Sequence, residues 1–314
     1  VLSNPEFLAE GTAIKDLEKP DRVLIGGENE NAINSLSKIY SNWVPKSKIL
    51  HTNIWSSELA KLTANAFLAQ RISSINSIAA ICEATGADVK EVSRAIGSDS
   101  RIGSKFLDCG PGFGGSCFKK DILNLVYLAE HFGLKEVALF WKSVVTLNKW
   151  HKHRISELIV KKLFGTVSGK KISILGFAFK SNTNDTRESA AITICKDLLE
   201  EGAILKIYDP KVVFHQIEKD LDLKKDKTMT NLQDYSSEIK EGTWSFSENI
   251  EEAINGTDAV VVLTEWEEYR RINWKKAAKK MRNPAWVFDA RSITNKKDIK
   301  DAGIKLWKIG DGLI

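Results

Sequence analysis

The chain has 314 residues, of which 43% are hydrophobic and 28% charged, and it carries a formal net charge of +5 at pH 7. This composition is typical of a folded protein of about two domains and excludes disordered, collagen-like and disulfide-rich classes. Four cysteines favour a reducing, cytoplasmic compartment, the basic excess is too evenly spread for nucleic acid, and no run approaches the roughly 18 apolar residues of a membrane helix.

Residues 1–53 have the pattern of the end of an α/β unit. A short apolar run at 22–25 is followed by two glycines and then, over 32–43, by apolar residues at helical spacing. A further short run at 49–50 predicts another strand. Because the chain begins at Val1 without an initiator methionine, we expect this segment to be the tail of a larger dinucleotide-binding domain.

Residues 54–165 are predicted to form a helical domain. The segment 55–85 has helical spacing and contains neither proline nor glycine. A helix of about 30 residues is near 45 Å long, which exceeds a small domain, and this one is apolar on more than one face. We expect it to join two domains or to form a subunit interface. Further helices are predicted at 89–96, 119–132 and 137–163.

From 166 to 314 the pattern changes to alternating strands and helices. Strands are predicted at 171–176, 205–208, 259–263, 286–288 and 305–308, and helices at 190–201 and 275–281. Strand–helix alternation predicts a parallel, Rossmann-like α/β domain. The charged segment 214–250 is predicted to be a surface insertion.

Residues 110–115, G-P-G-F-G-G, match the G-x-G-x-x-G spacing of a dinucleotide-binding turn. That turn must follow a buried strand and open a helix, with an acidic residue about 20 positions later. Residues 104–109 do not have the pattern of a buried strand, and Pro111 interrupts the turn. We therefore expect no dinucleotide fingerprint here.

The same glycines are better explained as the setting of Cys117, in G-F-G-G-S-C-F-K-K-D at 112–121. A helix that begins near Lys119 would place the Cys117 thiol at its N-terminus, where the helix dipole and neighbouring lysines favour a thiolate nucleophile. Asp121 would lie about one turn along and could hold a water molecule or act as a base. The alternative is that Cys117 is only a small buried residue.

The other cysteines are predicted to be structural. Cys82 and Cys195 lie in apolar helical patterns and are expected in the core, and Cys109 is expected in a loop. The five histidines are isolated, and no Cys/His spacing is typical of zinc. We expect no metal site.

Lys61 and Asn65 are four residues apart on the long predicted helix and therefore project from one face. A lysine and an asparagine in this arrangement can hold an oxyanion or orient an attacking water molecule. An ordinary solvated surface pair explains the spacing as well.

The segment 184–189, N-D-T-R-E-S, is predicted to open a helix, with Asp185 as N-cap and Glu188 at the third helical position. Lys180 and Arg187 would then place two cations beside a helix N-terminus, which suits a phosphate group. Ligands of open α/β sheets bind beyond the carboxyl ends of the strands, where polar residues follow three other predicted strands. We expect a diphosphate-bearing ligand there.

Five segments make the chain similar to a known family. They are N-P-E-F-L-A-E-G-T-A (4–13), A-N-A-F-L-A-Q-R-I-S-S-I-N-S (64–77), G-F-G-G-S-C-F-K-K-D (112–121), I-L-G-F-A-F-K (174–180) and N-D-T-R-E-S (184–189). Over essentially its full length the chain resembles the UDP-glucose/GDP-mannose dehydrogenase family, and within it the animal-type members that act on UDP-glucose.

The resemblance implies three parts, which in this chain would be the tail of an NAD-binding Rossmann domain (1–53), a central long-helix dimerisation region with the cysteine loop (54–165) and a UDP-sugar-binding α/β domain (166–314). It implies oxidation of UDP-glucose to UDP-glucuronate with two NAD per turnover, through a thiohemiacetal and a thioester on Cys117. It also implies a homo-oligomer, with a dimer formed through the long helix and a hexamer as the larger assembly.

The resemblance also assigns roles to single residues. The catalytic set is Cys117, Glu6 for acid–base chemistry, Lys61 and Asn65 for the oxyanion, and Asp121 with its water. Contacts to the sugar nucleotide fall on Glu10, Phe106, Phe113, Phe179, Lys180 and Arg291, and on Arg101, which reaches the substrate of the neighbouring subunit. Contacts to NAD fall on Lys120 and Arg187.

Some features depart from the family pattern. Asp108 stands where close relatives have a lysine, which would weaken or move one polar contact to the ligand, and Ala290 replaces a glycine before Arg291. Most of the family's NAD-binding domain is expected to be missing, so that the chain would be inactive alone. The alternatives are a non-catalytic module that binds UDP-sugars and oligomerises, and a dehydrogenase for another nucleotide sugar.

Overall fold

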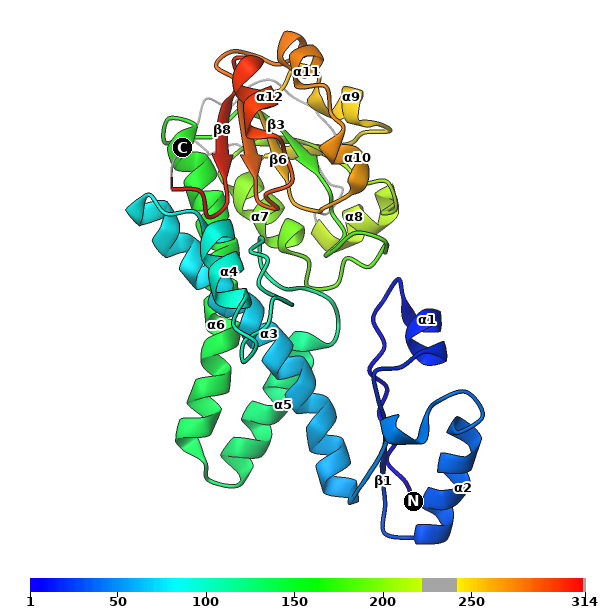
Figure 1. Cartoon of the computed structure of the whole chain (residues 1–314). Helices are drawn as coiled ribbons and strands as arrows, with labels where there is room; N and C mark the ends of the chain where they lie inside the picture. The colour runs from blue at the N-terminus through cyan, green and yellow to red at the C-terminus, as the bar shows by residue number, and fades with distance from the viewer. Residues whose placement is uncertain (222–241, 313–314) are drawn as a thin grey trace, which may run out of the picture. The chain divides into compact units, whose positions relative to one another are not determined.

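The computed structural model of the chain describes residues 1–221 and 242–312 (Figure 1). It divides into two compact units. Unit 1 comprises Val1–Ala69 and Cys117–Ser143, and unit 2 comprises Gln70–Ser116 and Val144–Ile314. Both units draw residues from the same two long helices, and the domain limits at residues 53 and 165 stay predictions.

Unit 1 begins with the expected end of an α/β unit. Strand β1 (Val23–Gly26) pairs in parallel with β2 (Ile49–Thr52), and α2 (Glu30–Tyr40) connects them. The side chain of Asn29 caps α2 by accepting a hydrogen bond from the Ala32 amide. The small core consists of Val23, Ile25 and Val44, with Leu2, Ile33, Leu36, Tyr40 and Ile49 packed against it. A short helix, α1 (Ala13–Glu18), precedes β1.

The predicted central helices are confirmed to within two residues at each end. They are α3 (Ile54–Thr85), α4 (Val89–Gly97), α5 (Phe118–His131) and α6 (Lys135–Lys162). With 32 residues, α3 is about 48 Å long at 1.5 Å per residue. None of the described helices combines the length and apolar character needed to cross a membrane.

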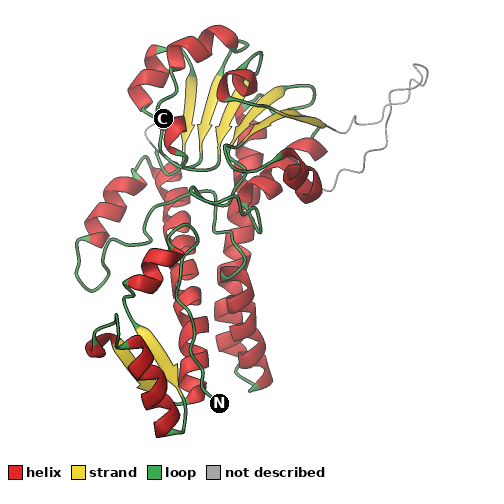
Figure 2. Cartoon of the chain, turned by 90° about the vertical axis from the view of Figure 1, so that its right-hand side faces the viewer, coloured by secondary structure: helices red, strands yellow, loops and turns green. Residues whose placement is uncertain are grey.

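Unit 2 contains a six-stranded, all-parallel sheet in the order β5-β4-β3-β6-β7-β8 (Figure 2). The strands are β3 (Lys171–Leu175), β4 (Ile204–Tyr208), β5 (Thr243–Phe246), β6 (Ala259–Val262), β7 (Trp286–Asp289) and β8 (Lys305–Lys308). In chain order this is the 3-2-1-4-5-6 arrangement of doubly wound Rossmann folds, whose ligands bind where the strand order reverses. That point lies between β3 and β6. The predicted fold class is confirmed.

Helices cover the sheet of unit 2 in two groups (Figure 1). The first is α7 (Ala190–Glu200) with α8 (Phe214–Leu221), and the second is α9 (Ile250–Ile254), α11 (Trp274–Lys280) and α12 (Lys296–Asp301). A turn of helix, α10 (Glu267–Arg270), follows β6. The core of unit 2 extends from the buried strands to Ile75 and Ala79 of α3 and to Ile155 and Ile159 of α6.

The predicted surface insertion at 214–250 is wrong where the structure describes it. Residues 214–221 form α8 and residues 243–246 form β5, while 222–241 lie outside the described residues. The strand β5 is at the edge of the sheet and pairs only with β4, so only Trp244 and Phe246 of its four residues are partly covered. Such a strand lacks the continuous apolar run of the buried strands.

Candidate functional site

Cys117 is the N-cap of α5, as the sequence predicts, and its thiol is exposed. The other three cysteines, all within the described residues, are buried. Burial raises the pKa of the Cys109 thiol to about 12 and also raises the pKa of Cys195. Accessible cysteines at helix N-termini are the ones that act as nucleophiles, whereas buried thiols are inert. The alternative of a buried Cys117 is therefore wrong.

Lys61 of α3 contacts Glu6 of the loop near the N-terminus. The ammonium donates to the Glu6 backbone oxygen at 2.5 Å and to carboxylate Oε1 at 3.0 Å, and the Leu8 amide donates to Oε2 at 2.7 Å. Partial burial opposes ionisation of Glu6, but the Leu8 amide and the charges of Lys61 and Lys120 together lower the pKa of this carboxyl. Glu6 is therefore a carboxylate at neutral pH.

Asn65, one turn further along α3, contacts a different carboxylate. Its amide Nδ2 donates to Asp121 Oδ2 at 2.6 Å. Asp121 is buried in the first turn of α5, and its own amide donates to the Cys117 backbone oxygen at 2.9 Å. All five predicted catalytic residues therefore lie in unit 1. They are connected by these side-chain contacts and by single turns of α3 and α5. Lys61 and Asn65 are each partly buried, and each contacts a carboxylate.

Arg291 occupies the point in unit 2 where the strand order reverses. Its Nε donates to the Leu263 backbone oxygen at 2.8 Å, and a terminal nitrogen donates to the Phe179 backbone oxygen at 2.7 Å. Nε also lies 3.1 Å from the carboxylate of Glu265. Arg291 therefore links the segments that follow β3, β6 and β7, which are the carboxyl ends of neighbouring parallel strands.

The glycine segment 110–115 lies against the same residues. A Cβ added to Gly110 would come 3.2 Å from a guanidinium nitrogen of Arg291, and one on Gly114 would come 2.8 Å from Phe179 Cβ. The Gly115 amide donates to the Arg187 backbone oxygen at 2.8 Å. This segment is an irregular loop that no strand directly precedes, whereas a dinucleotide-binding turn follows a buried strand.

Phe113, Phe179 and Lys180 thus belong to one region of unit 2 with Arg291. Phe113 is buried within the glycine segment, whereas Phe179 and Lys180 are half-buried. Two other predicted ligand residues lie in the loop before this segment. Phe106 is exposed with a left-handed φ of 61°, and Arg101 is exposed and pairs with Asp99 at 2.6 Å.

The predicted helix start at Asp185 is wrong. Helix α7 begins at Ala190, and Ser189 is its N-cap. Glu188 has a left-handed φ of 55°, which no helix residue adopts, and Asp185 instead accepts hydrogen bonds from Arg187. Asp185 and Glu188 satisfied the spacing of a capping box, but the Ser189 hydroxyl provides the acceptor one turn later.

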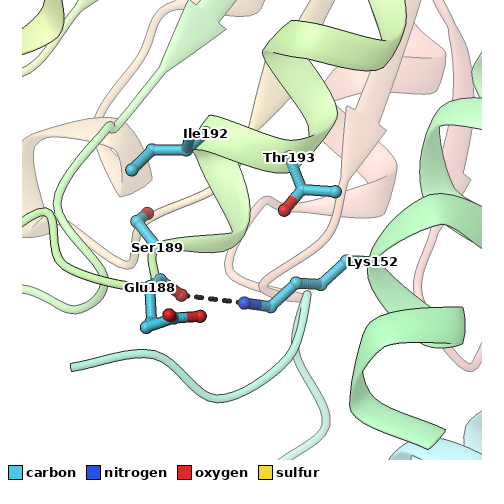
Figure 3. A pocket seen from close by; sticks show the side chains of 5 residues that line it. All are labelled: Lys152, Glu188, Ser189, Ile192 and Thr193. Carbon is cyan, nitrogen blue, oxygen red and sulfur yellow. Dashed lines mark hydrogen bonds between the residues drawn. The ribbon is translucent and has the colours of Figure 1, made fainter. Parts of the chain in front are cut away.

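Lys152 of α6 is a buried residue of this region that sequence reasoning missed. Its ammonium donates to the Glu188 backbone oxygen at 2.8 Å, beside a hollow of about 170 Å³ (Figure 3). Ser189, Ile192 and Thr193 at the start of α7 complete the lining. The contact attaches α6 to the loop that carries Lys180 and Arg187.

Three further buried polar residues contact the glycine segment, and sequence reasoning missed them as well. They are Asn76 of α3 and Asn148 and His151 of α6. On α6, the residues 148, 151 and 152 follow helical spacing on the face that buries Val144 and Ile155. Polar residues on an otherwise apolar helix face were the available signal.

The protein is expected to become less stable as the pH falls, because of His151. Burial, assisted by Arg154, lowers the pKa of His151 from 6.5 to about 4, although the hydrogen bond to Gly110 opposes this shift. Between those values the unfolded chain binds a proton that the folded chain excludes. The free energy of unfolding should therefore decrease by up to about 3 kcal/mol as pH falls from 6.5 to 4.

Urea unfolding at pH 7 and pH 4.5 would measure this loss, with His151→Gln as the comparison. Glutamine does not titrate, so the free energy of unfolding should decrease less in the His151→Gln variant than in the wild type. Equal decreases in the two proteins would contradict the assignment.

Comparison with known proteins points to the family that the sequence resembles. Three models of the UDP-glucose/GDP-mannose dehydrogenase family match the chain: its NAD binding domain at residues 1–44, its central domain at 55–150 and its UDP binding domain at 173–296. The UDP-glucose 6-dehydrogenase of Drosophila melanogaster is 54% identical over 99% of this chain. UDP-glucose 6-dehydrogenase 4 of Arabidopsis thaliana is 52% identical over 100% of it.

Among solved structures, a UDP-glucose dehydrogenase from the archaeon Pyrobaculum islandicum is similar, with a TM-score of 0.80 and 30% identity over 99% of this chain. The chain spans 64% of the Drosophila protein, 66% of the Arabidopsis protein and 63% of the archaeal structure.

Proposed function

This chain belongs to the UDP-glucose/GDP-mannose dehydrogenase family, and from that premise we propose that it carries the reacting cysteine and the UDP-sugar site of an NAD-dependent UDP-glucose 6-dehydrogenase. One observation carries the proposal. The loop that leads to the exposed Cys117 packs against Phe179 and Arg291, at the strand ends where a Rossmann-like sheet binds its ligand.

The proposed reaction oxidises C6 of UDP-glucose twice. NAD, when bound, accepts the hydride of each oxidation. After the first, the Cys117 thiolate adds to the C6 aldehyde, and the resulting thiohemiacetal becomes a thioester in the second. Water then cleaves the thioester, which releases UDP-glucuronate and regenerates the thiol.

The residues joined to Cys117 in unit 1 supply the remaining chemistry. The Lys61 ammonium and the Asn65 amide stabilise negative charge on the oxygen at C6. Asp121, which accepts from Asn65, orients the attacking water, and the Glu6 carboxylate accepts a proton. The contact of Lys61 with Glu6 couples the charge of the acid–base group to that of the oxyanion group.

The residues of unit 2 hold the nucleotide. Arg291 and Lys180 provide positive charge for the diphosphate, and the rings of Phe113 and Phe179 provide apolar surface. Glu10, Phe106 and, across a subunit boundary, Arg101 complete the proposed contacts. We propose a homo-oligomer, with a dimer through α3 and a hexamer as the larger assembly, in the cytoplasm.

Two exposed cations fit the negative charge of NAD. Lys120 follows Cys117 in the first turn of α5, and Arg187 precedes α7. The segment 110–115 does not fit a dinucleotide, because it is a buried loop packed on Phe179. We therefore assign to the described residues only these two contacts with NAD.

The 314-residue chain is expected to bind UDP-glucose, and Arg291→Ala should weaken that binding by about 10- to 100-fold because a charged hydrogen-bonding group is lost. Isothermal titration calorimetry measures the affinity. Arg282→Ala is the matched control. Arg282 also pairs with a carboxylate, that of Asp258, but Asp258 lies directly before β6, at the amino end of the strand and away from the proposed ligand.

Equal binding by wild type and Arg291→Ala would contradict the site. A panel of nucleotide sugars with NAD separates the remaining alternatives. Preference for another sugar would make the chain a different dehydrogenase, and UDP-glucuronate formation by the chain itself would exclude the non-catalytic module.

A further inference from the structure

The segment Gly110–Phe113 is buried but belongs to no helix or strand. The backbone N–H and C=O groups of such a segment need other partners, since leaving them unpaired inside a protein is costly. In this structure side chains from two helices supply those partners. Asn76, Asn148 and His151 together form this loop clamp.

The loop clamp satisfies the backbone of both ends of the segment. The Gly110 amide donates to Asn76 Oδ1 at 2.9 Å, and the Gly110 oxygen accepts from His151 Nε2 at 2.9 Å. At Phe113 one side chain does both tasks, because Asn148 Oδ1 accepts from the amide at 2.9 Å and Nδ2 donates to the oxygen at 3.1 Å. The Asn148 amide therefore pairs with Phe113 as a neighbouring strand would.

Two polar atoms of the loop clamp weaken the fold instead of stabilising it. All three clamp residues are nearly inaccessible, and their remaining polar atoms, Asn76 Nδ2 and His151 Nδ1, have no hydrogen-bond partner among the described residues. Buried polar atoms without partners destabilise a fold. Polar groups that cost stability are expected where they position a functional segment.

The segment that the clamp fixes has little freedom to move on its other side. Gly110 lies close to the Arg291 guanidinium, and a Cβ on Gly114, the residue directly after the segment, would come 2.7 Å from the Glu188 backbone oxygen. Gly112 has a φ of 122°, and a Cβ there would come 2.8 Å from Asn148 Oδ1. The helix side chains and the ligand-binding residues therefore enclose the segment from two directions.

We propose that the loop clamp consists of positioning residues that hold Phe113 and the glycine segment in the shape that binds the UDP-sugar beside Arg291. The inference rests on the proposed function and extends it to residues of α3 and α6 that do not touch the substrate. Their effect on binding passes through the backbone of Gly110 and Phe113.

The test compares UDP-glucose affinity in the 314-residue chain with the clamp intact or broken. Asn148→Leu removes both bonds to Phe113 at similar volume, and His151→Leu removes the bond to Gly110. Each should raise the Kd for UDP-glucose about tenfold or more, the effect of one or two lost hydrogen bonds. His151→Gln can place a side-chain N–H at the position of Nε2, and it should restore most of the affinity.

Ser73→Ala is the matched control. The Ser73 hydroxyl, also buried on α3, donates to the Val144 backbone oxygen of α6 at 3.2 Å and not to the glycine segment. It should lower the urea midpoint without changing the Kd. Gly112→Ala disturbs the same contact from the loop and leaves the sequence of both helices unaltered. It should also weaken binding, and it provides the test if the Asn148 variant fails to fold.

Three results would overturn the inference while the proposed function stands. The first is an unchanged Kd for UDP-glucose in folded Asn148→Leu or Gly112→Ala. The others are an equal loss of affinity in His151→Gln and His151→Leu, or a loss of affinity in Ser73→Ala as large as in the clamp variants. Absence of UDP-glucose binding by the wild-type chain would overturn the proposed function and, with it, this inference.

Discussion

Cys117→Ser is expected to abolish UDP-glucuronate formation by the whole protein, with a fall in rate of at least about 10³-fold, as is typical when a covalent nucleophile is removed. A serine hydroxyl at the start of α5 remains protonated and adds poorly to an aldehyde, so no acyl intermediate forms. The measurement is UDP-glucuronate by chromatography together with NADH by absorbance. Undiminished steady-state oxidation to the acid would contradict the thioester role.

Cys109→Ser is the control for this substitution. Cys109 lies in the same irregular stretch eight residues earlier, but it is buried and directs its thiol to the Ile309 backbone oxygen. Its replacement should leave acid formation in place. Iodoacetamide followed by mass spectrometry should label the native wild-type chain at Cys117 and spare the three buried cysteines.

The elements predicted best were those with strong local signals. The helix from Ile54 to Thr85 contains no glycine or proline, and the strand at 259–262 is apolar and buried throughout. These patterns fix the element type without knowledge of the neighbours. The strand at 243–246 was missed because its pattern depends on an edge position, which only the assembled sheet defines.

The candidate site was predictable where its residues are close in sequence. Cys117 and Asp121 are one helix turn apart, so their relation follows from spacing alone. The contact of Lys61 with Glu6 spans 55 residues, and no periodic pattern encodes it. The resemblance to a family, not the spacing, brought Glu6 into the predicted group.

The loop clamp could not be predicted because its partners are backbone atoms. A sequence shows that Asn148 and His151 are polar residues on an apolar helix face, but not that the backbone of Gly110 and Phe113 lies opposite them. The same holds for Lys152, whose acceptor is the Glu188 backbone oxygen. Buried polar side chains indicate a partner without identifying it.

Lys61→Ala is expected to lower kcat of the whole protein by about 10²- to 10³-fold and to change KM much less, because an oxyanion contact forms chiefly in the transition state. Steady-state kinetics at saturating NAD measures both constants. Lys48→Ala is the matched control, since Lys48 also lies in unit 1 and donates to a backbone oxygen, that of Pro20, at 2.8 Å. An effect confined to KM would contradict the oxyanion role.

The same variant tests the coupling of Lys61 to Glu6 independently of turnover. Lys61 is one of the groups that lower the pKa of Glu6 below 4.5, so its removal should raise that pKa, which NMR titration of the 314-residue chain can follow. If Glu6 accepts a proton in the reaction, it must be ionised, and the acid limb of the rate profile must then move to higher pH in Lys61→Ala. A lower kcat with an unchanged acid limb would support the oxyanion role of Lys61 and contradict proton transfer to Glu6.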